Sequence, residues 1–172
     1  MYGRSVLRRF LSTPEVTHAD GIQGLNTTET FWQGESSGSY FHPLSKDDRF
    51  FLLAGGGTSF KQDPVFNNFS LGGPFRLGAF NNDELRASNY VLGTVGYLHR
   101  FGRLPDVLGA NIFGGGWLEN GSAFDDWGDA KWRSNVSAGA IIESLIGPVF
   151  VGGSLAFDGR SRIYIAIGTL FR

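Results

Sequence analysis

The sequence predicts an all-β protein, an antiparallel transmembrane β-barrel, and three observations carry that prediction. Glycine accounts for 26 of the 172 residues and aromatic residues for 15%, a composition that disfavours helices and suits short strands. The last segment, RIYIAIGTLFR (162–172), alternates with period two, because Ile163, Ile165 and Ile167 share one face and smaller residues with Tyr164 share the other. Alternating segments of about 9–11 residues recur along the chain, and that length spans a bilayer when a strand is tilted.

Eight strand segments are expected in total, and turn-forming residues separate them. Their expected bounds are Tyr2–Ser12, Thr28–Pro43, Arg49–Phe60, Asn89–Phe101, Val107–Glu119, Arg133–Ser144, Gly147–Phe157 and Ser161–Phe171. The last five show one apolar face and one polar or small face, as expected when lipid lies outside and water or a packed loop lies inside. Aromatic residues near the segment ends suit an interfacial girdle. A soluble β-barrel or sandwich with an aromatic core is the alternative that this pattern leaves open.

Composition and charge exclude several classes of function. The net charge of −1 argues against nucleic acid as a partner, and the absence of cysteine removes disulfides and thiol catalysis. The arginines near Met1 are not followed by an apolar core, so no signal peptide is visible. A G-x-S-x-G pattern at 34–38 lacks the helix that a nucleophile elbow requires. The three histidines are scattered and the aspartates of 125–129 suit a solvated loop, so neither a catalytic residue nor a metal or other cofactor is expected.

The long connection between the third and fourth strand segments carries a resemblance to a known family. Residues 61–88 read KQDPVFNNFSLGGPFRLGAFNNDELRAS, and NYVLGTVGYLHRF follows. This stretch resembles the barrel of the BamA/TpsB superfamily of outer-membrane assembly and secretion proteins, and most closely the C-terminal barrel domain of patatin-like autotransporters. Arg76, Gly78 and Phe80 stand at the arginine, glycine and aromatic places of the family's loop motif. Gly168 and Phe171 are similar to the ending that such barrels present to the insertion machinery.

The resemblance, which covers approximately residues 49–172, implies a location and a function. It implies an integral protein of the bacterial outer membrane that acts as a pore, translocator or insertase-like scaffold and is not an enzyme. The expected partners are the lipid bilayer and the barrel assembly machinery. The alternative is a barrel that anchors or dimerises a patatin-like phospholipase encoded elsewhere.

The resemblance also implies that the motif's arginine points into the lumen, toward acidic residues on the next two strands. Gly96 and the glycines at 114–115 occupy the usual acidic places in this chain. A guanidinium in a protein-lined lumen requires a carboxylate, so we expect a substitute acid as the partner of Arg76. Three candidates remain, Glu143 first and then Glu119 and Asp158. The other reading is that Arg76 is solvated in the loop.

Strand number decides how the predicted barrel closes. The family barrel has sixteen strands, whereas residues 1–172 are expected to form a single domain with eight, a half-barrel with one lumen-facing loop at 61–88. An eight-stranded barrel is too narrow to hold such a loop, and open strand edges in lipid are costly. A narrow barrel with the loop outside is one solution. The favoured solution is a homodimer in which two copies join edge to edge into sixteen strands.

Overall fold

The structure, a computed structural model, describes residues 2–6, 33–59, 69–102, 111–143 and 147–168. Apart from one short 3-10 helix, Trp127–Asp129, the regular structure in these ranges is antiparallel β, which confirms the predicted all-β class. No helix in the described ranges is long and apolar enough to cross a membrane.

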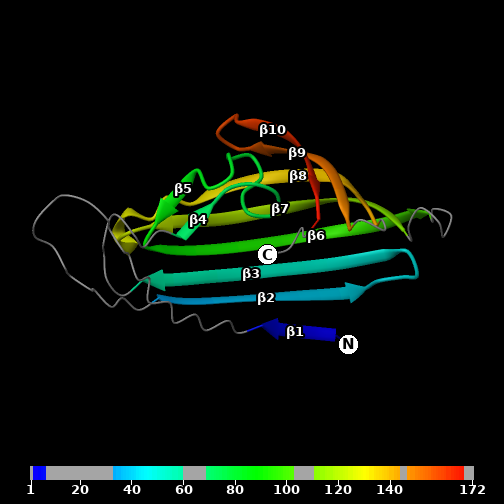
Figure 1. Ribbon diagram of the computed structural model, residues 1–172, viewed down its shortest axis with the longest axis horizontal. Coiled ribbons are helices and arrows are strands. Elements are labelled where there is room, and N and C mark those ends of the chain that lie inside the picture. Colours follow the sequence, from blue (N-terminus) through cyan, green and yellow to red (C-terminus); the bar gives the residue numbers. More distant parts are fainter. Residues whose placement is uncertain (1, 7–32, 60–68, 103–110, 144–146, 169–172) are drawn as a thin grey trace, which may run out of the picture.

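The main sheet has eight strands in the order β1-β2-β3-β6-β7-β8-β9-β10, and each is antiparallel to its neighbours. Figure 1 shows this sheet as a curved layer with β4 and β5 on one side of it. The strands of the main sheet are β1 (Tyr2–Val6), β2 (Gln33–Pro43), β3 (Asp48–Ser59), β6 (Asn89–Gly102), β7 (Ile112–Phe124), β8 (Arg133–Ile142), β9 (Val149–Ala156) and β10 (Ser161–Ile167).

The strands differ from the expected ones chiefly in two respects, apart from shifts of one or two residues at several other ends. Strand β7 continues past Glu119 to Phe124, where it still pairs with Asn89 of β6. The long loop contains two further strands, β4 (Phe69–Leu71) and β5 (Leu85–Ala87), which pair only with each other. Three-residue strands are too short to show alternation, so only their packing against the main sheet reveals them.

The sheet is open. Strands β1 and β10 are its edges, and within the described residues they do not pair with each other. A closed barrel is therefore not formed by the described part of a single chain. Because every neighbouring pair is antiparallel and the number of strands is even, β1 and β10 run in opposite directions.

The two faces of the sheet differ in chemistry. One face buries aromatic side chains, among them Phe51, Phe113, Trp117 and Phe150. The other face leaves aliphatic side chains in contact with solvent, with Ile163 86% exposed. Alternation along each strand produces this division, because successive side chains point to opposite faces. The exposed aliphatic residues of the strands are Leu52, Val95, Leu118, Val136, Val151, Leu155, Ile163, Ile165 and Ile167.

The loop at 69–88 covers the face with the buried aromatic residues. Leu71, Leu77 and Phe80 of the loop are buried together with Tyr90 of β6 and Ala156 of β9. Phe75 belongs to the aromatic cluster of the sheet itself. The loop therefore supplies the second layer of the core, in the place that a second sheet or a helix takes in other β proteins.

A buried seat for the long loop

The motif segment of the loop folds as a series of tight turns. The Arg76 N–H donates to the Gly73 carbonyl at 3.0 Å, and the Gly72 N–H donates to the Arg76 carbonyl at 2.7 Å. Phe75 and Leu77 have φ values of 61° and 67°, a left-handed conformation that is uncommon for bulky residues. Backbone of this kind persists only where surrounding contacts hold it in place, and the loop makes such contacts on both sides of Arg76.

Phe75 inserts into an aromatic box on the sheet, which consists of Phe51, Trp117 and Phe150. Its ring stacks on Trp117 with centroids 4.4 Å apart and an interplanar angle of 15°. The Phe150 and Phe51 rings lie 5.2 and 6.4 Å away. Gly96 lies beneath the box, where a Cβ would be 2.5 Å from both the Phe51 ring and the Trp117 side chain. The glycine that stands at an expected acidic place is therefore the one that lets these rings lie against the sheet.

Glu119 binds the motif through the backbone of the loop. Its side chain lies in the middle of β7, and the residue is 1% exposed. One carboxylate oxygen accepts the N–H of Leu77 at 3.2 Å, and the other accepts the N–H of Gly78 at 3.1 Å. Ser137 donates to the second oxygen at 2.8 Å, and the Asn135 amide donates there as well. These four donors provide the hydrogen bonds that a buried carboxylate requires.

Arg76 makes a different contact from the expected ion pair. Its guanidinium donates to the Ser70 carbonyl at 2.9 Å and lies 5.6 Å from the centre of the Tyr90 ring. The Tyr90 hydroxyl in turn donates to Glu35 of β2 at 2.6 Å. Among the described contacts, the positive charge of Arg76 is therefore met by a carbonyl and an aromatic face.

The other two candidate acids lie elsewhere and have their own partners. Glu143 follows the far end of β8 and accepts a hydrogen bond from the Asn111 amide at 2.6 Å. Asp158 lies in the β9–β10 turn, 3.4 Å from the Arg160 guanidinium. Of the three candidates, the structure brings only Glu119 to the motif, and it does so through the N–H groups on the C-terminal side of Arg76.

Gly78 and Phe80 contact the last two strands. A Cβ on Gly78 would lie 2.3 Å from the Ser154 hydroxyl oxygen and 2.6 Å from that of Tyr164, so any larger residue here would displace these two hydroxyl groups. The Phe80 ring is buried, and the guanidinium of Arg160 lies 5.0 Å from its centre. The Phe80 carbonyl accepts a hydrogen bond from Arg162 at 2.9 Å.

A chain of hydroxyl groups extends from Glu119 across the sheet. Ser137 of β8 links Glu119 to Ser154 of β9, since its oxygen lies 2.8 Å from the carboxylate and 2.5 Å from the Ser154 oxygen. Tyr164 of β10 continues the chain, also at 2.5 Å. None of these three residues is among the predicted site residues. Each of them is a polar residue on the inward face of one of three adjacent strands. That they lie side by side can be recognised only when the register of the strands is known.

The outer side of the loop is held by charged groups. Glu84 accepts the N–H of Asn81 at 2.7 Å and a hydrogen bond from Arg160 at 2.5 Å. The backbone N–H of Asn81, with a further contribution from Arg160, lowers the pKa of Glu84 below its ordinary value, because both stabilise the charged carboxylate. The Ser70 hydroxyl donates to Asp83 in the same region.

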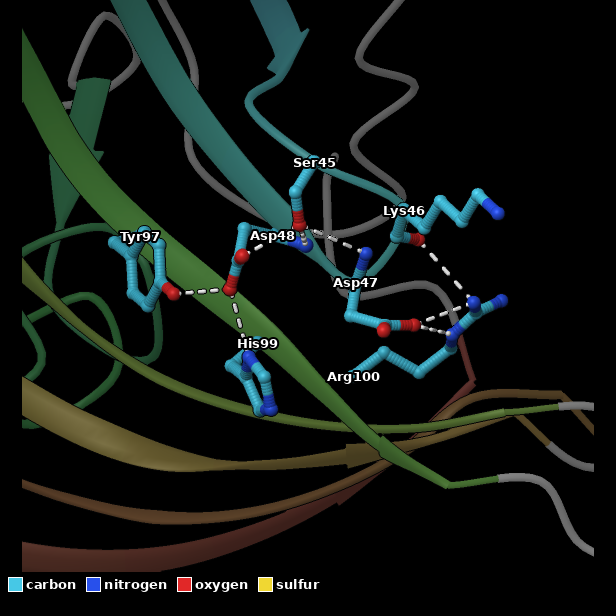
Figure 2. Close-up of polar contacts among 7 residues, drawn as sticks. All are labelled: Ser45, Lys46, Asp47, Asp48, Tyr97, His99 and Arg100. Atoms are coloured by element: carbon cyan, nitrogen blue, oxygen red, sulfur yellow. Dashed lines mark hydrogen bonds and ion pairs between the residues drawn. The ribbon is translucent and has the colours of Figure 1, made fainter.

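A second polar cluster lies at the opposite end of the sheet, where β2 turns into β3 (Figure 2). The Asp48 carboxylate accepts from the Ser45 hydroxyl at 2.5 Å, lies 2.7 Å from the His99 Nδ1 and also accepts from the Tyr97 hydroxyl. Arg100 donates to Asp47 at 2.5 Å. These contacts fasten the β2–β3 turn to the end of β6, and both oxygens of the Asp48 carboxylate take part in them.

The expected C-terminal signal is described in part. Gly168 has a φ of 102°, and its N–H donates to the Pro148 carbonyl at 2.9 Å, whereas Phe171 lies outside the described residues. In the described ranges no group of three or more His, Cys, Asp or Glu side chains could hold a metal ion. Neither the protein-family models nor the curated proteins contain a match to this chain. What the site does is therefore argued from its geometry alone. That geometry is a sheet surface that binds the loop through the Glu119 carboxylate and the aromatic box.

Proposed function

We propose that this chain is a membrane-embedded β-barrel subunit of the outer-membrane assembly and secretion type, acting as a pore, translocator or insertase-like scaffold. The observation that carries the proposal is the exposed apolar face of the sheet. On β7, β8, β9 and β10 this face holds aliphatic side chains and small residues with no charged residue among them. An exposed apolar surface that continues over several strands favours contact with lipid.

Polar groups lie at both ends of this apolar face. At the loop end, Thr58 donates to Asn89 at 2.6 Å and Asn120 donates to Ser134 at 2.6 Å, each across a strand pair. At the other end lies the cluster of Asp48, described above. Large aromatic side chains are exposed near these limits, with Trp132 and Phe157 at the loop end and Tyr97 and Phe101 at the other. Such a band, flanked by polar and aromatic residues, is typical of a surface that spans a bilayer.

The opposite face supports a gated lumen. In a barrel whose apolar face meets lipid, the face that carries Glu119 and the loop faces inward. The loop then lies across the lumen and is held by the Glu119 carboxylate and the aromatic box. We propose that this loop closes the lumen and that its displacement opens a path through the barrel.

Two copies would complete the barrel. The backbone groups at the free edges of β1 and β10 would cost several kcal/mol each if they met hydrocarbon unpaired. The edges run in opposite directions, so β10 of one copy can pair with β1 of the other in the antiparallel manner that the rest of the sheet uses. The twofold axis then lies along the barrel axis, and the sixteen strands leave room for both loops.

Four measurements test this proposal. The chain should require detergent for extraction and show a heat-modifiable band on a semi-native gel, and native mass spectrometry should give twice its mass of 18.8 kDa. In planar bilayers it should conduct ions when the loop is displaced from its seat. A protein that is soluble without detergent contradicts the membrane proposal. A detergent-bound species that is strictly monomeric and rich in β structure contradicts the dimer alone.

A further inference from the structure

The loop contacts the last strand through three side chains of the terminal hairpin. Arg162 donates to the Phe80 carbonyl at 2.9 Å, and Arg160 donates to Glu84 at 2.5 Å. The Tyr164 hydroxyl lies so close to Gly78 that no side chain would fit there. These contacts join two parts of the chain that are separated by about eighty residues.

Strand β10 has little other support. Within the described residues its sheet partner is β9 alone, and its second edge is unpaired. Its outward side chains, Ile163, Ile165 and Ile167, are exposed. The remaining contacts of β10 come from its inward face, where Tyr164 packs against the Phe150 ring at 5.4 Å and continues the hydroxyl chain to Glu119.

We infer that the loop at 69–88 and strand β10 form one cooperative unit, in which the seated loop holds the free edge of β10 in place to accept the first strand of a second copy. Arg162 and Tyr164 are the positioning residues of this interface between loop and strand. When the loop leaves its seat, β10 loses its second set of contacts and its edge becomes disordered. The inference rests on the proposed barrel for the identity of the partner strand, whereas the coupling between loop and strand rests on the contacts described above.

The physical reason is the entropy of an edge strand. An edge strand that is ordered before it meets its partner does not have to lose that conformational freedom on binding. Coupling of this kind is reciprocal. A change in the loop must therefore alter β10, and a change in β10 must alter the loop by a comparable factor.

Hydrogen exchange of the whole chain in detergent tests this coupling, with Gly78→Ala as the first variant. Its Cβ would overlap the Ser154 and Tyr164 hydroxyl oxygens. We expect amide exchange to rise about tenfold in both 69–88 and 161–167, whereas exchange in the middle of β6 stays unchanged. The matched control is Gly38→Ala, because a Cβ at Gly38 has nothing within 4 Å. Faster exchange in the loop with unchanged exchange at 161–167 would overturn the inference.

Tyr164→Phe tests the coupling in the other direction and keeps the ring against Phe150. We expect faster exchange of the Leu77 and Gly78 amides, which bind Glu119. Unchanged exchange of these two amides overturns the inference even where Gly78→Ala fails to fold. The dimer fraction should fall in both variants. If amide exchange rises in both the loop and β10 while the dimer fraction stays the same, the loop does not order β10 for pairing with a second copy. The exchange readout needs neither lipid insertion nor dimers, so a water-soluble monomer with coupled exchange would refute the proposed function and leave the coupling intact.

Discussion

The carboxylate of Glu119 accepts the backbone N–H of Gly78 at 3.1 Å, across a separation of 41 residues in the chain. This bond joins the middle of a strand to the glycine of the loop motif. The neighbouring bond to the Leu77 N–H uses the other oxygen of the same carboxylate. Both oxygens of Glu119 are therefore committed to the loop.

Glu119→Gln should loosen the loop. An amide offers one oxygen where the carboxylate offers two, and it turns an N–H₂ group toward the N–H donors of the loop. The expected loss is about 1–3 kcal/mol, since buried donors lose their acceptor. Limited proteolysis of the loop in the folded protein measures it. Glu143→Gln is the control, because Glu143 binds only at the far end of the sheet, and equal protease sensitivity of the two variants would contradict the role of Glu119.

Phe75→Ala should remove the main apolar anchor of the loop. The ring is buried in the aromatic box, and truncation of a buried phenylalanine costs about 3–5 kcal/mol. Thermal unfolding followed by circular dichroism should show a lower midpoint. The control is Phe101→Ala, which removes the same ring from a side chain that is 73% exposed and should change the midpoint much less. If Phe75→Ala leaves the unfolding midpoint unchanged, the aromatic box does not anchor the loop.

Arg76→Ala should weaken the loop less than Glu119→Gln does. Arg76 contributes one hydrogen bond to the Ser70 carbonyl and a contact with the Tyr90 ring, which together are worth about 1–2 kcal/mol. Chemical denaturation with the same loop-cleavage readout gives the difference. The control is Arg86→Ala, since the exposed Arg86 side chain donates to the Asp83 carbonyl within the loop and, among the described residues, to no group of the sheet. A loss larger than that of Glu119→Gln would mean that Arg76 has an acidic partner after all.

If the apolar face of the sheet meets lipid as proposed, Ile165→Lys should impair membrane assembly. Ile165 lies at the middle of β10 on the apolar face, and a lysine at the bilayer midplane of a β-barrel costs about 2–4 kcal/mol. Ser161→Lys, at the end of the same strand and on the same face, should cost much less, because the penalty falls toward the interface. The yield of heat-modifiable protein in lipid vesicles measures both. Equal yields for the two variants would argue against lipid on this face.

The loop should become easier to cleave in acid because of Glu84. Its pKa is lowered in the folded protein, first by the Asn81 N–H. A lowered pKa contributes stability above the ordinary value of 4.5, and this contribution is lost as the pH falls through the folded value. Protease resistance of residues 69–88 should therefore decrease as the pH falls below 4.5. Glu84→Gln should remove that part of the pH dependence, and an unaltered pH profile would count against the contact.

Much of the main sheet could be predicted from alternation alone. Strands β6, β8, β9 and β10 show a period of two, because one face is apolar and exposed while the other carries polar and small residues together with buried aromatic or aliphatic ones. The chemistry of the loop could be predicted only in part. The motif singled out Arg76, Gly78 and Phe80, and each of them contacts the sheet or packs within the loop's own core.

The partners of these residues could not be predicted, because they depend on register and on backbone direction. The left-handed turns at Phe75 and Leu77 send the Phe75 ring into the sheet and point two N–H groups at Glu119. The expected strand ends at Glu119, whereas β7 continues to Phe124. The predicted partner of the substitute acid is the Arg76 guanidinium, whereas the loop groups that Glu119 binds are two backbone amides.

The stacking of Phe75 on Trp117 gives the protein a reporter of its own. Among the described tryptophans, Trp127 and Trp132 are exposed, whereas the Trp117 indole is covered by the loop. Its emission is therefore shielded from a dissolved quencher such as acrylamide for as long as Phe75 remains in place. With Trp32, Trp127 and Trp132 replaced, Trp117 is the one tryptophan left in the sequence, and its emission follows the position of the loop in real time without a label.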